Sequence, residues 1–139
     1  RYIVVDAVSA KKAPKLQGIL QSIDTLKVNV YELAALSTKT EMTEQINELL
    51  RSGVGEIIVT NGKYPVYYAS SEIKVMMEPF EIDEIINATG AGDAFVAGYV
   101  HGIINKKDVN DRLAYALKMA YLTLQSPTSV NQHIVFEEE

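Results

Sequence analysis

Short apolar runs rich in β-branched residues alternate along this chain with longer segments of helical character, and this alternation limits the possible fold most strongly. The runs at residues 2–8 and 56–60 have the composition of buried strands, and residues 41–52 place their apolar side chains on one helical face. Strands that alternate with helices predict an α/β fold with a mostly parallel sheet flanked by helices. Asn61-Gly62 is a hairpin signal, so we expect residues 65–69 to return as an antiparallel strand.

The remaining elements are assigned by the same patterns. We expect extended segments at residues 25–30, 73–77 and 82–86, and helices at residues 9–22, 91–105 and 109–125. Ser9 is the expected cap of the first of these helices, and Gly53 fits the position that follows the helix over residues 41–52. Ligands of such sheets bind at the carboxyl ends of the strands, so we expect functional side chains there.

Composition excludes several classes of function. A chain of 139 residues suits one domain with one core. Its net charge of −5 has the wrong sign for a protein whose main ligand is nucleic acid. The sequence has no cysteine and no long uninterrupted apolar stretch, so disulfides, thiolate catalysis and membrane insertion are disfavoured and a cytoplasmic location is expected. Because Arg1 stands directly before an apolar strand, we interpret the chain as part of a longer protein.

One segment has the composition of an anion site. The stretch Asn87-Ala88-Thr89-Gly90-Ala91-Gly92-Asp93-Ala94-Phe95 follows an apolar strand and opens an apolar helix. Glycines allow close approach of the backbone to a ligand, and the amide N–H groups at a helix N-terminus attract an anion such as phosphate. Asp93 falls in the first helical turn beside this cradle, where a carboxylate would repel a phosphate unless it had a chemical role.

Phosphoryl transfer gives that carboxylate a role. Asp93 would orient an acceptor hydroxyl and take its proton, while the amides of Gly90, Ala91 and Gly92 would stabilise the charge on the transferred group. An ordinary strand-to-helix turn is the alternative that the same residues also permit. A dinucleotide-binding fingerprint is excluded, because it needs glycine where Phe95 stands.

The stretch from Asn87 to Gly98 resembles the second signature of the ribokinase-like (PfkB) family of carbohydrate and nucleoside kinases. Upstream, Asn29-Val30-Tyr31-Glu32 is similar to the Asn-x-x-Glu motif of that family, and Thr60-Asn61-Gly62 is similar to its Thr-x-Gly turn. The order and spacing of the three motifs agree with the family, and the resemblance covers the whole chain. It implies a ribokinase-like α/β fold, represented here by the C-terminal part.

The resemblance also implies an activity: transfer of the γ-phosphoryl group of ATP to a primary hydroxyl of a sugar or nucleoside. It makes Asp93 the catalytic base and the amides of residues 90–92 the anion hole. Glu32, together with Asn29, would help to hold hydrated Mg²⁺ and the ATP phosphates. The other nucleotide-site residues that it implies are Thr60, Gly62 and Thr89. Without the resemblance, Asn29 and Glu32 also fit a helix cap and a first-turn acid.

Within the family, the sequence is similar to pseudouridine kinases, notably at Val8-Ser9-Ala10-Lys11-Lys12 and Thr25-Leu26-Lys27. Pseudouridine is therefore the favoured acceptor, with ribose, fructose and adenosine as alternatives. Asn87 stands where many ribokinase-like enzymes have aspartate. Because that loop often forms a monovalent-cation site, the resemblance leaves activation by K⁺ open.

The resemblance assigns residues 1–139 to a single domain, the ATP-side half of such a kinase. The N-terminal sugar-binding half and the lid over the acceptor have no counterpart in this sequence. The lid is often used for dimerisation, so a homodimer of the intact protein is compatible with the resemblance. The rival interpretation is a non-catalytic nucleotide-binding or regulatory module that has kept the fold.

Overall fold

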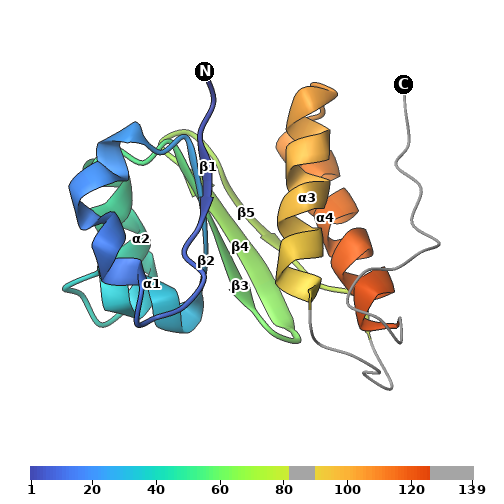
Figure 1. Cartoon of the computed structure of the whole chain (residues 1–139), viewed down its shortest axis with the longest axis horizontal. Coiled ribbons are helices and arrows are strands. Elements are labelled where there is room, and N and C mark those ends of the chain that lie inside the picture. Colours follow the sequence, from blue (N-terminus) through green and yellow to red (C-terminus); the bar gives the residue numbers. More distant parts are fainter. Residues whose placement is uncertain (82–89, 126–139) are drawn as a thin grey trace. The chain divides into compact units, whose positions relative to one another are not determined.

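The computed structural model describes residues 1–81 and 90–125. The chain divides into two compact units, Arg1–Glu78 and Pro79–Glu139, each of which is described by itself (Figure 1). The strand expected at residues 82–86 and the predicted site residues Asn87 and Thr89 lie outside the described residues.

The first unit contains a five-stranded sheet in the order β1-β2-β3-β4-β5. The strands are β1 (Val4–Asp6), β2 (Thr25–Asn29), β3 (Glu56–Asn61), β4 (Tyr64–Ser70) and β5 (Lys74–Met77). The first three strands are parallel, whereas β4 and β5 are antiparallel to their neighbours. The α/β fold is confirmed. The sheet is mixed, because the two tight turns after β3 and β4 can only join antiparallel strands, and the first of these is the return strand that the sequence predicts. Gly62, at φ +57°, makes the first of these turns, as the hairpin signal predicts.

Three helices cover one face of this sheet in the first unit (Figure 1). They are the 3₁₀-helix η1 (Ala13–Ser22) and the α-helices α1 (Val30–Leu36) and α2 (Met42–Arg51). Alternate side chains of the central strands, Leu26 and Val28 in β2 and Ile57 and Val59 in β3, form the core under these helices. Every second side chain of β2 and β3 therefore points into this core, and the intervening side chains point to the opposite face of the sheet.

One predicted helix start differs from the structure, and one predicted helix end agrees with it. The helix expected over residues 9–22 is a 3₁₀-helix that starts only at Ala13, because Ser9 first closes a turn in which its Oγ and its carbonyl both accept the amide of Lys12, at 3.2 and 3.1 Å. The helix expected over residues 41–52 is confirmed as α2. Gly53 follows it at φ +108°, the left-handed conformation that favours glycine after a helix.

The described residues of the second unit form two helices, α3 (Ala91–Ile104) and α4 (Val109–Leu124), as the sequence predicts to within one residue. The two helices approach closely at Gly98, where an added Cβ would lie 2.9 Å from the Cα of Ala116. Asp108 caps α4 by accepting the amide of Asp111 at 2.8 Å. Among the helices of residues 1–81 and 90–125, none is long and apolar enough to cross a membrane.

Candidate active site

The carboxyl ends of β2 and β3 bring the first two predicted motifs together. Asn29 and Thr60 are register partners in the parallel pairing of these strands. Asn29 ends β2 and is also the N-cap of α1, so it marks the point where the chain turns from the sheet into the helix. The motif residues Asn29, Glu32 and Thr60 therefore lie at one edge of the sheet, the edge at which α/β proteins bind their ligands.

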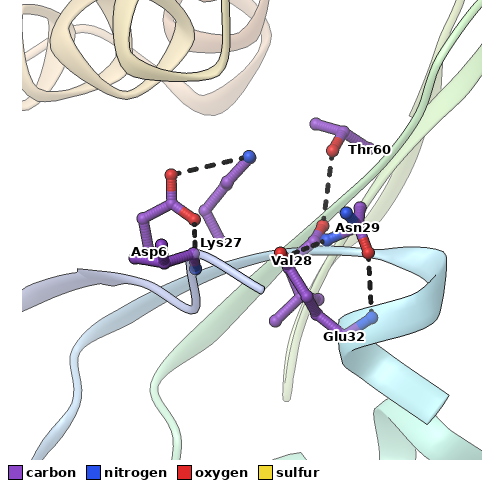
Figure 2. Close-up of polar contacts among 7 residues, drawn as sticks. Asp6, Lys27, Val28, Asn29, Glu32 and Thr60 are labelled. Carbon is purple, nitrogen blue, oxygen red and sulfur yellow. Dashed lines mark hydrogen bonds and ion pairs between the residues drawn. The ribbon is translucent and has the colours of Figure 1, made fainter. Parts of the chain in front are cut away.

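Asn29 and Glu32 form a capping box (Figure 2). The Asn29 Oδ1 atom accepts the amides of Tyr31 and Glu32 at 3.0 and 2.8 Å. In return, Glu32 Oε1 accepts the amide of Asn29 at 2.8 Å. The helix-cap interpretation of this spacing is thus confirmed, because three amides at the start of α1 gain partners from these two side chains.

The capping box does not use all of the oxygens of Glu32. Its side chain is 3% exposed, yet within the described part of the chain its second carboxylate oxygen makes no hydrogen bond. Mg²⁺ keeps several waters and is commonly bound through one or two carboxylates together with the phosphates of a substrate. A single carboxylate with one uncommitted oxygen fits such a hydrated ion. Residues 1–81 and 90–125 contain no cluster of three or more acidic or histidine side chains that would hold a metal ion by itself.

Thr60 and Gly62 lie where β3 leaves the sheet. The pairing of β3 with β4 shifts register between Val59 and Asn61, so Thr60 sits at an irregularity of the ladder. Its Oγ1 donates to the carbonyl of Val28 in the neighbouring strand at 3.5 Å. Gly62 is exposed, and an added Cβ would meet nothing within 4 Å. The glycine is therefore required by its positive φ rather than by lack of space.

A salt bridge at the same edge was not among the predicted site residues. The Lys27 Nζ atom lies 3.6 Å from Asp6 Oδ2, and the two residues are register partners in β2 and β1 (Figure 2). The sequence signal for it was a lysine that is the single charged residue of the strand predicted at residues 25–30. A lone charge in a strand that is buried along most of its length demands a partner, but the sequence does not say which acid supplies it.

In the second unit, the glycine segment forms the start of α3. Gly90 is the N-cap, in the left-handed conformation at φ 86° and ψ −5°, and no side chain caps the helix at this position. The first intrahelical bond runs from the amide of Ala94 to the carbonyl of Gly90 at 2.9 Å. The amides that precede Ala94 have no partner inside the helix, which is the general property that makes helix N-termini bind anions.

Asp93 lies in the first turn of α3 with its side chain exposed. A carboxylate at this place is favoured by the helix dipole and is open to solutes that approach the helix start. The structure thus gives the predicted cradle of Gly90, Ala91 and Gly92 the backbone form that anion binding needs, with a carboxylate beside it.

The first unit is an α/β sheet with polar side chains at its carboxyl edge, and the second unit has a helix that begins at a left-handed glycine. Each of these features is common in α/β proteins that bind phosphate compounds. Comparison with protein families gives the more specific assignment. Residues 2–133 match the model of the pfkB family carbohydrate kinases. The chain belongs to this family, and the resemblance found in its motifs is confirmed at that level.

Individual relatives do not favour one member of the family. The chain is 28% identical to a ribokinase of Arabidopsis thaliana over 129 residues, which cover 88% of this chain and 34% of that protein. It is 33% identical to a pseudouridine kinase of Escherichia coli over 102 residues, which cover 69% of this chain and 32% of that protein. The chain thus spans about a third of the length of these relatives.

Solved structures show the same fold. A sugar kinase from Clostridium perfringens superimposes with a TM-score of 0.87 at 25% identity, covering 95% of this chain and 43% of the other. A structure described as a ribokinase II from E. coli in complex with ATP and Mg²⁺ superimposes with a TM-score of 0.85 at 24% identity, covering 94% and 45%. The ribokinase-like fold expected from the sequence is confirmed.

Proposed function

We propose that this chain is the nucleotide-binding half of an ATP-dependent kinase that phosphorylates a primary hydroxyl of a sugar or nucleoside. Family membership supports phosphoryl transfer to an alcohol as the reaction class. The observation that carries the proposal is the start of α3, where a left-handed Gly90 exposes backbone amides beside the exposed carboxylate of Asp93. An anion cradle explains the glycines, and phosphoryl transfer gives a chemical role to an acid placed beside a bound phosphate.

In the proposed mechanism, Asp93 accepts the proton of the acceptor hydroxyl while the hydroxyl oxygen bonds to the γ-phosphorus and the bond from that phosphorus to the ADP oxygen breaks. The amides of Gly90, Ala91 and Gly92 donate to the oxygens of the transferred group, whose charge they stabilise. These donors are backbone groups held by the helix, so they need no rearrangement during the reaction.

The carboxyl edge of the first unit would serve the nucleotide. Glu32 would hold Mg²⁺ through water with its uncommitted oxygen, and the ion would neutralise charge on the ATP phosphates when bound. Asn29, Thr60 and Gly62 would line the nucleotide site, to which the family resemblance adds Thr89. Asn87, which the resemblance connects with a monovalent cation, makes K⁺ a variable to test in the assay.

Pseudouridine is the favoured acceptor within this proposal, with ribose, fructose and adenosine as the alternatives. The reason is the similarity of residues 8–12 and 25–27 to pseudouridine kinases, and the 33% identity to one such enzyme is compatible with it. We also propose that the intact protein works in the cytoplasm, where its cosubstrate ATP is available, and that it can form a homodimer.

The test is phosphotransfer by the intact gene product with Mg-ATP and a panel of pseudouridine, uridine, adenosine, ribose and fructose, with and without K⁺, read by mass spectrometry. Asp93→Ala should reduce turnover by at least about 100-fold while ATP affinity stays similar or rises. Asp111→Ala is the matched control, because Asp111 is likewise an exposed first-turn acid, but of α4. Equal turnover of wild type and the Asp93 variant would contradict the role assigned to Asp93.

A non-catalytic nucleotide-binding module is the second candidate. It is favoured by one observation: Asp93 is an exposed acid in the first turn of α3, a place that the helix dipole favours for a carboxylate without any catalytic role. This candidate predicts that ATP raises the melting temperature of the wild-type protein while none of the acceptors is phosphorylated.

A further inference from the structure

Strand β5 is the last strand of the sheet that the described residues form, and β4 is its one neighbour there. Lys74 in β5 and Glu78, which directly follows the strand, are exposed, and Met76 between them is 59% exposed. An edge strand presents unpaired N–H and C=O groups to any further strand, so proteins cover such edges or block them. The edge at β5 therefore needs either a partner or a feature that excludes one.

The hydrogen bonds of the β4–β5 hairpin show which backbone groups of β5 point outward. The amide of Ser70 donates to the carbonyl of Ile73 at 2.9 Å, and these two residues continue the register of the β4–β5 pairing. In an antiparallel ladder, hydrogen-bonded pairs alternate with pairs that are not hydrogen-bonded. Ile73 and every second residue after it therefore direct their backbone groups toward β4, whereas Lys74 and Met76 direct theirs outward.

The side chains of the outward residues share the face of the sheet that the helices cover. Met76 stands opposite Tyr67, which stands opposite Val59, a residue of the core under the helices. Alternate residues of a strand share a face, so Lys74 lies on this face as well. A hollow of about 190 Å³ lies beside them, and its lining includes Ile46 of α2. Helix α2 thus leaves the outer part of this face uncovered.

A second copy of this chain can extend the sheet at β5 only in certain registers. Two identical antiparallel strands in one sheet are related by a two-fold axis perpendicular to the sheet, and this axis keeps every side chain on its own face. Residues directly opposite each other must share a face, so the register must be centred on a residue that pairs with its own copy. The possible centres within β5 are its four residues, Lys74–Met77.

Charge excludes three of these centres. A centre at Lys74 puts two lysines opposite each other, and a centre at Val75 brings Glu72 of the turn opposite Glu78. Like charges directly opposite each other are destabilising. A centre at Met77 leaves Glu78 opposite a methionine and Lys74 without an acid.

A centre at Met76 satisfies both the charges and the backbone. It puts Lys74 of each copy opposite Glu78 of the other, so two pairs of opposite charge flank the two methionines. The outward groups of Met76 bond to those of its own copy, and Lys74 and Glu78, two positions away on either side, form the next hydrogen-bonded pairs. The two exposed Met76 side chains lie side by side next to the hollow, where a flexible thioether chain adapts to an irregular space.

We propose that two copies of this protein pair their β5 strands in antiparallel fashion about Met76, which joins their sheets into one. Lys74 hinders pairing with an arbitrary edge strand, and Glu78 of a second copy converts this hindrance into attraction. The interface is the same surface on both copies, which is the rule for two-fold dimers. It gives the proposed homodimer a surface within the present chain, and it depends neither on ATP binding nor on phosphoryl transfer.

Charge reversal in the intact protein tests the pairing. Lys74→Glu and Glu78→Lys each turn two attractive pairs into two repulsive ones, so each should raise the dissociation constant of the dimer about 10- to 100-fold in sedimentation experiments. The double variant restores opposite charges and should restore the dimer. An equimolar mixture of the two single variants should also associate. Lys15→Glu, at an exposed lysine of η1, makes the same change in net charge and should leave the mass unchanged.

A cross-link tests the register. Hydrogen-bonded antiparallel pairs have Cα atoms about 5.5 Å apart, a separation that a disulfide can span. Met76→Cys should therefore give a disulfide-linked dimer on oxidation, whereas Lys15→Cys should not. These 139 residues contain no cysteine, and wild type treated in the same way reports any thiol elsewhere in the intact protein. Thermal melting shows whether each variant is folded.

The outcomes separate this inference from the proposed function. An equal mass of wild type and both single variants would overturn the pairing, whatever the cross-link shows, because any dimer would then use another surface. A double variant that stays dissociated would overturn it too, since the losses would then come from distortion of β5. If the charge reversals behave as expected but no acceptor is phosphorylated, the proposed function fails and the pairing stands.

Discussion

Substitutions of Asn29 can distinguish its role as the cap of helix α1 from a role in binding the nucleotide. Asn29→Ala removes the oxygen that accepts the amides of Tyr31 and Glu32 at 3.0 and 2.8 Å, whereas the bond from the Asn29 amide to Glu32 survives because it uses the backbone. Loss of an N-cap side chain costs about 1 kcal/mol, within a range of about 0.5–2 kcal/mol. For a chain of this length that corresponds to a fall of about 4 °C in Tm.

Asn29→Asp provides the comparison. Aspartate keeps an acceptor for both amides and places a negative charge at the start of α1, where the helix dipole favours it. The nearby carboxylate of Glu32 opposes this gain, so we expect a stability within about 0.5 kcal/mol of wild type. If Asn29 also faces the ATP phosphates, the new charge repels them and ATP binding weakens by at least about tenfold.

Two measurements on wild type and both variants test the two roles separately. Thermal melting reports the stability that the cap provides, and calorimetry reports the affinity for ATP. A role in capping alone gives a less stable Asn29→Ala and an ATP affinity that Asn29→Asp leaves unchanged. A dual role gives the same loss of stability together with weak ATP binding by Asn29→Asp. An Asn29→Ala variant that melts like wild type would refute the capping argument.

Other predictions concern packing and pH. Gly98→Ala gains about 1 kcal/mol in helix propensity but brings a Cβ to 2.9 Å from the Cα of Ala116, and such overpacking costs about 1–3 kcal/mol, so we expect a lower Tm. Gly18→Ala in η1, where a Cβ meets nothing within 4 Å, should leave Tm equal or higher; a lower Tm there would contradict this contrast. The side-chain and backbone hydrogen bonds from Thr38, with a smaller contribution from Ser37, lower the pKa of Glu48 to about 2. Because the folded pKa lies below the unfolded value, this stabilisation is complete above about pH 4.5 and is lost as the pH falls toward 2. Urea unfolding of Glu48→Gln should therefore differ from wild type at pH 7 and converge with it near pH 2, and a constant difference would refute the assignment.

Local patterns predicted much of the fold. The bounds of α2, α3 and α4 and the hairpin between β3 and β4 agree closely with the sequence, because glycines, turn residues and helical periodicity act over a few neighbouring residues. The start of η1 was less predictable. Ser9 competes for the amide of Lys12 within a turn, and local competition of this kind shifts boundaries without changing the pattern.

The candidate site likewise contains residues that the sequence predicted and residues that it did not. Asn29, Glu32, Thr60 and Gly62 form recognisable motifs because each acts on backbone that is close in sequence, through a cap or a turn. Lys27 carried only the signal of a single charge in its strand, and its partner Asp6 stands in another strand.

The sequence by itself determined the alternation of strands and helices, the glycine turn that opens α3 and the family of the chain, since all three depend on residue types at short and regular spacing. Only the tertiary structure decided that β1 lies beside β2 in the register that pairs Asp6 with Lys27, and that the backbone of α4 at Ala116 packs closely against Gly98 of α3. Pairings between distant residues depend on the order of strands and on how closely helices pack, and no short stretch of sequence specifies these properties.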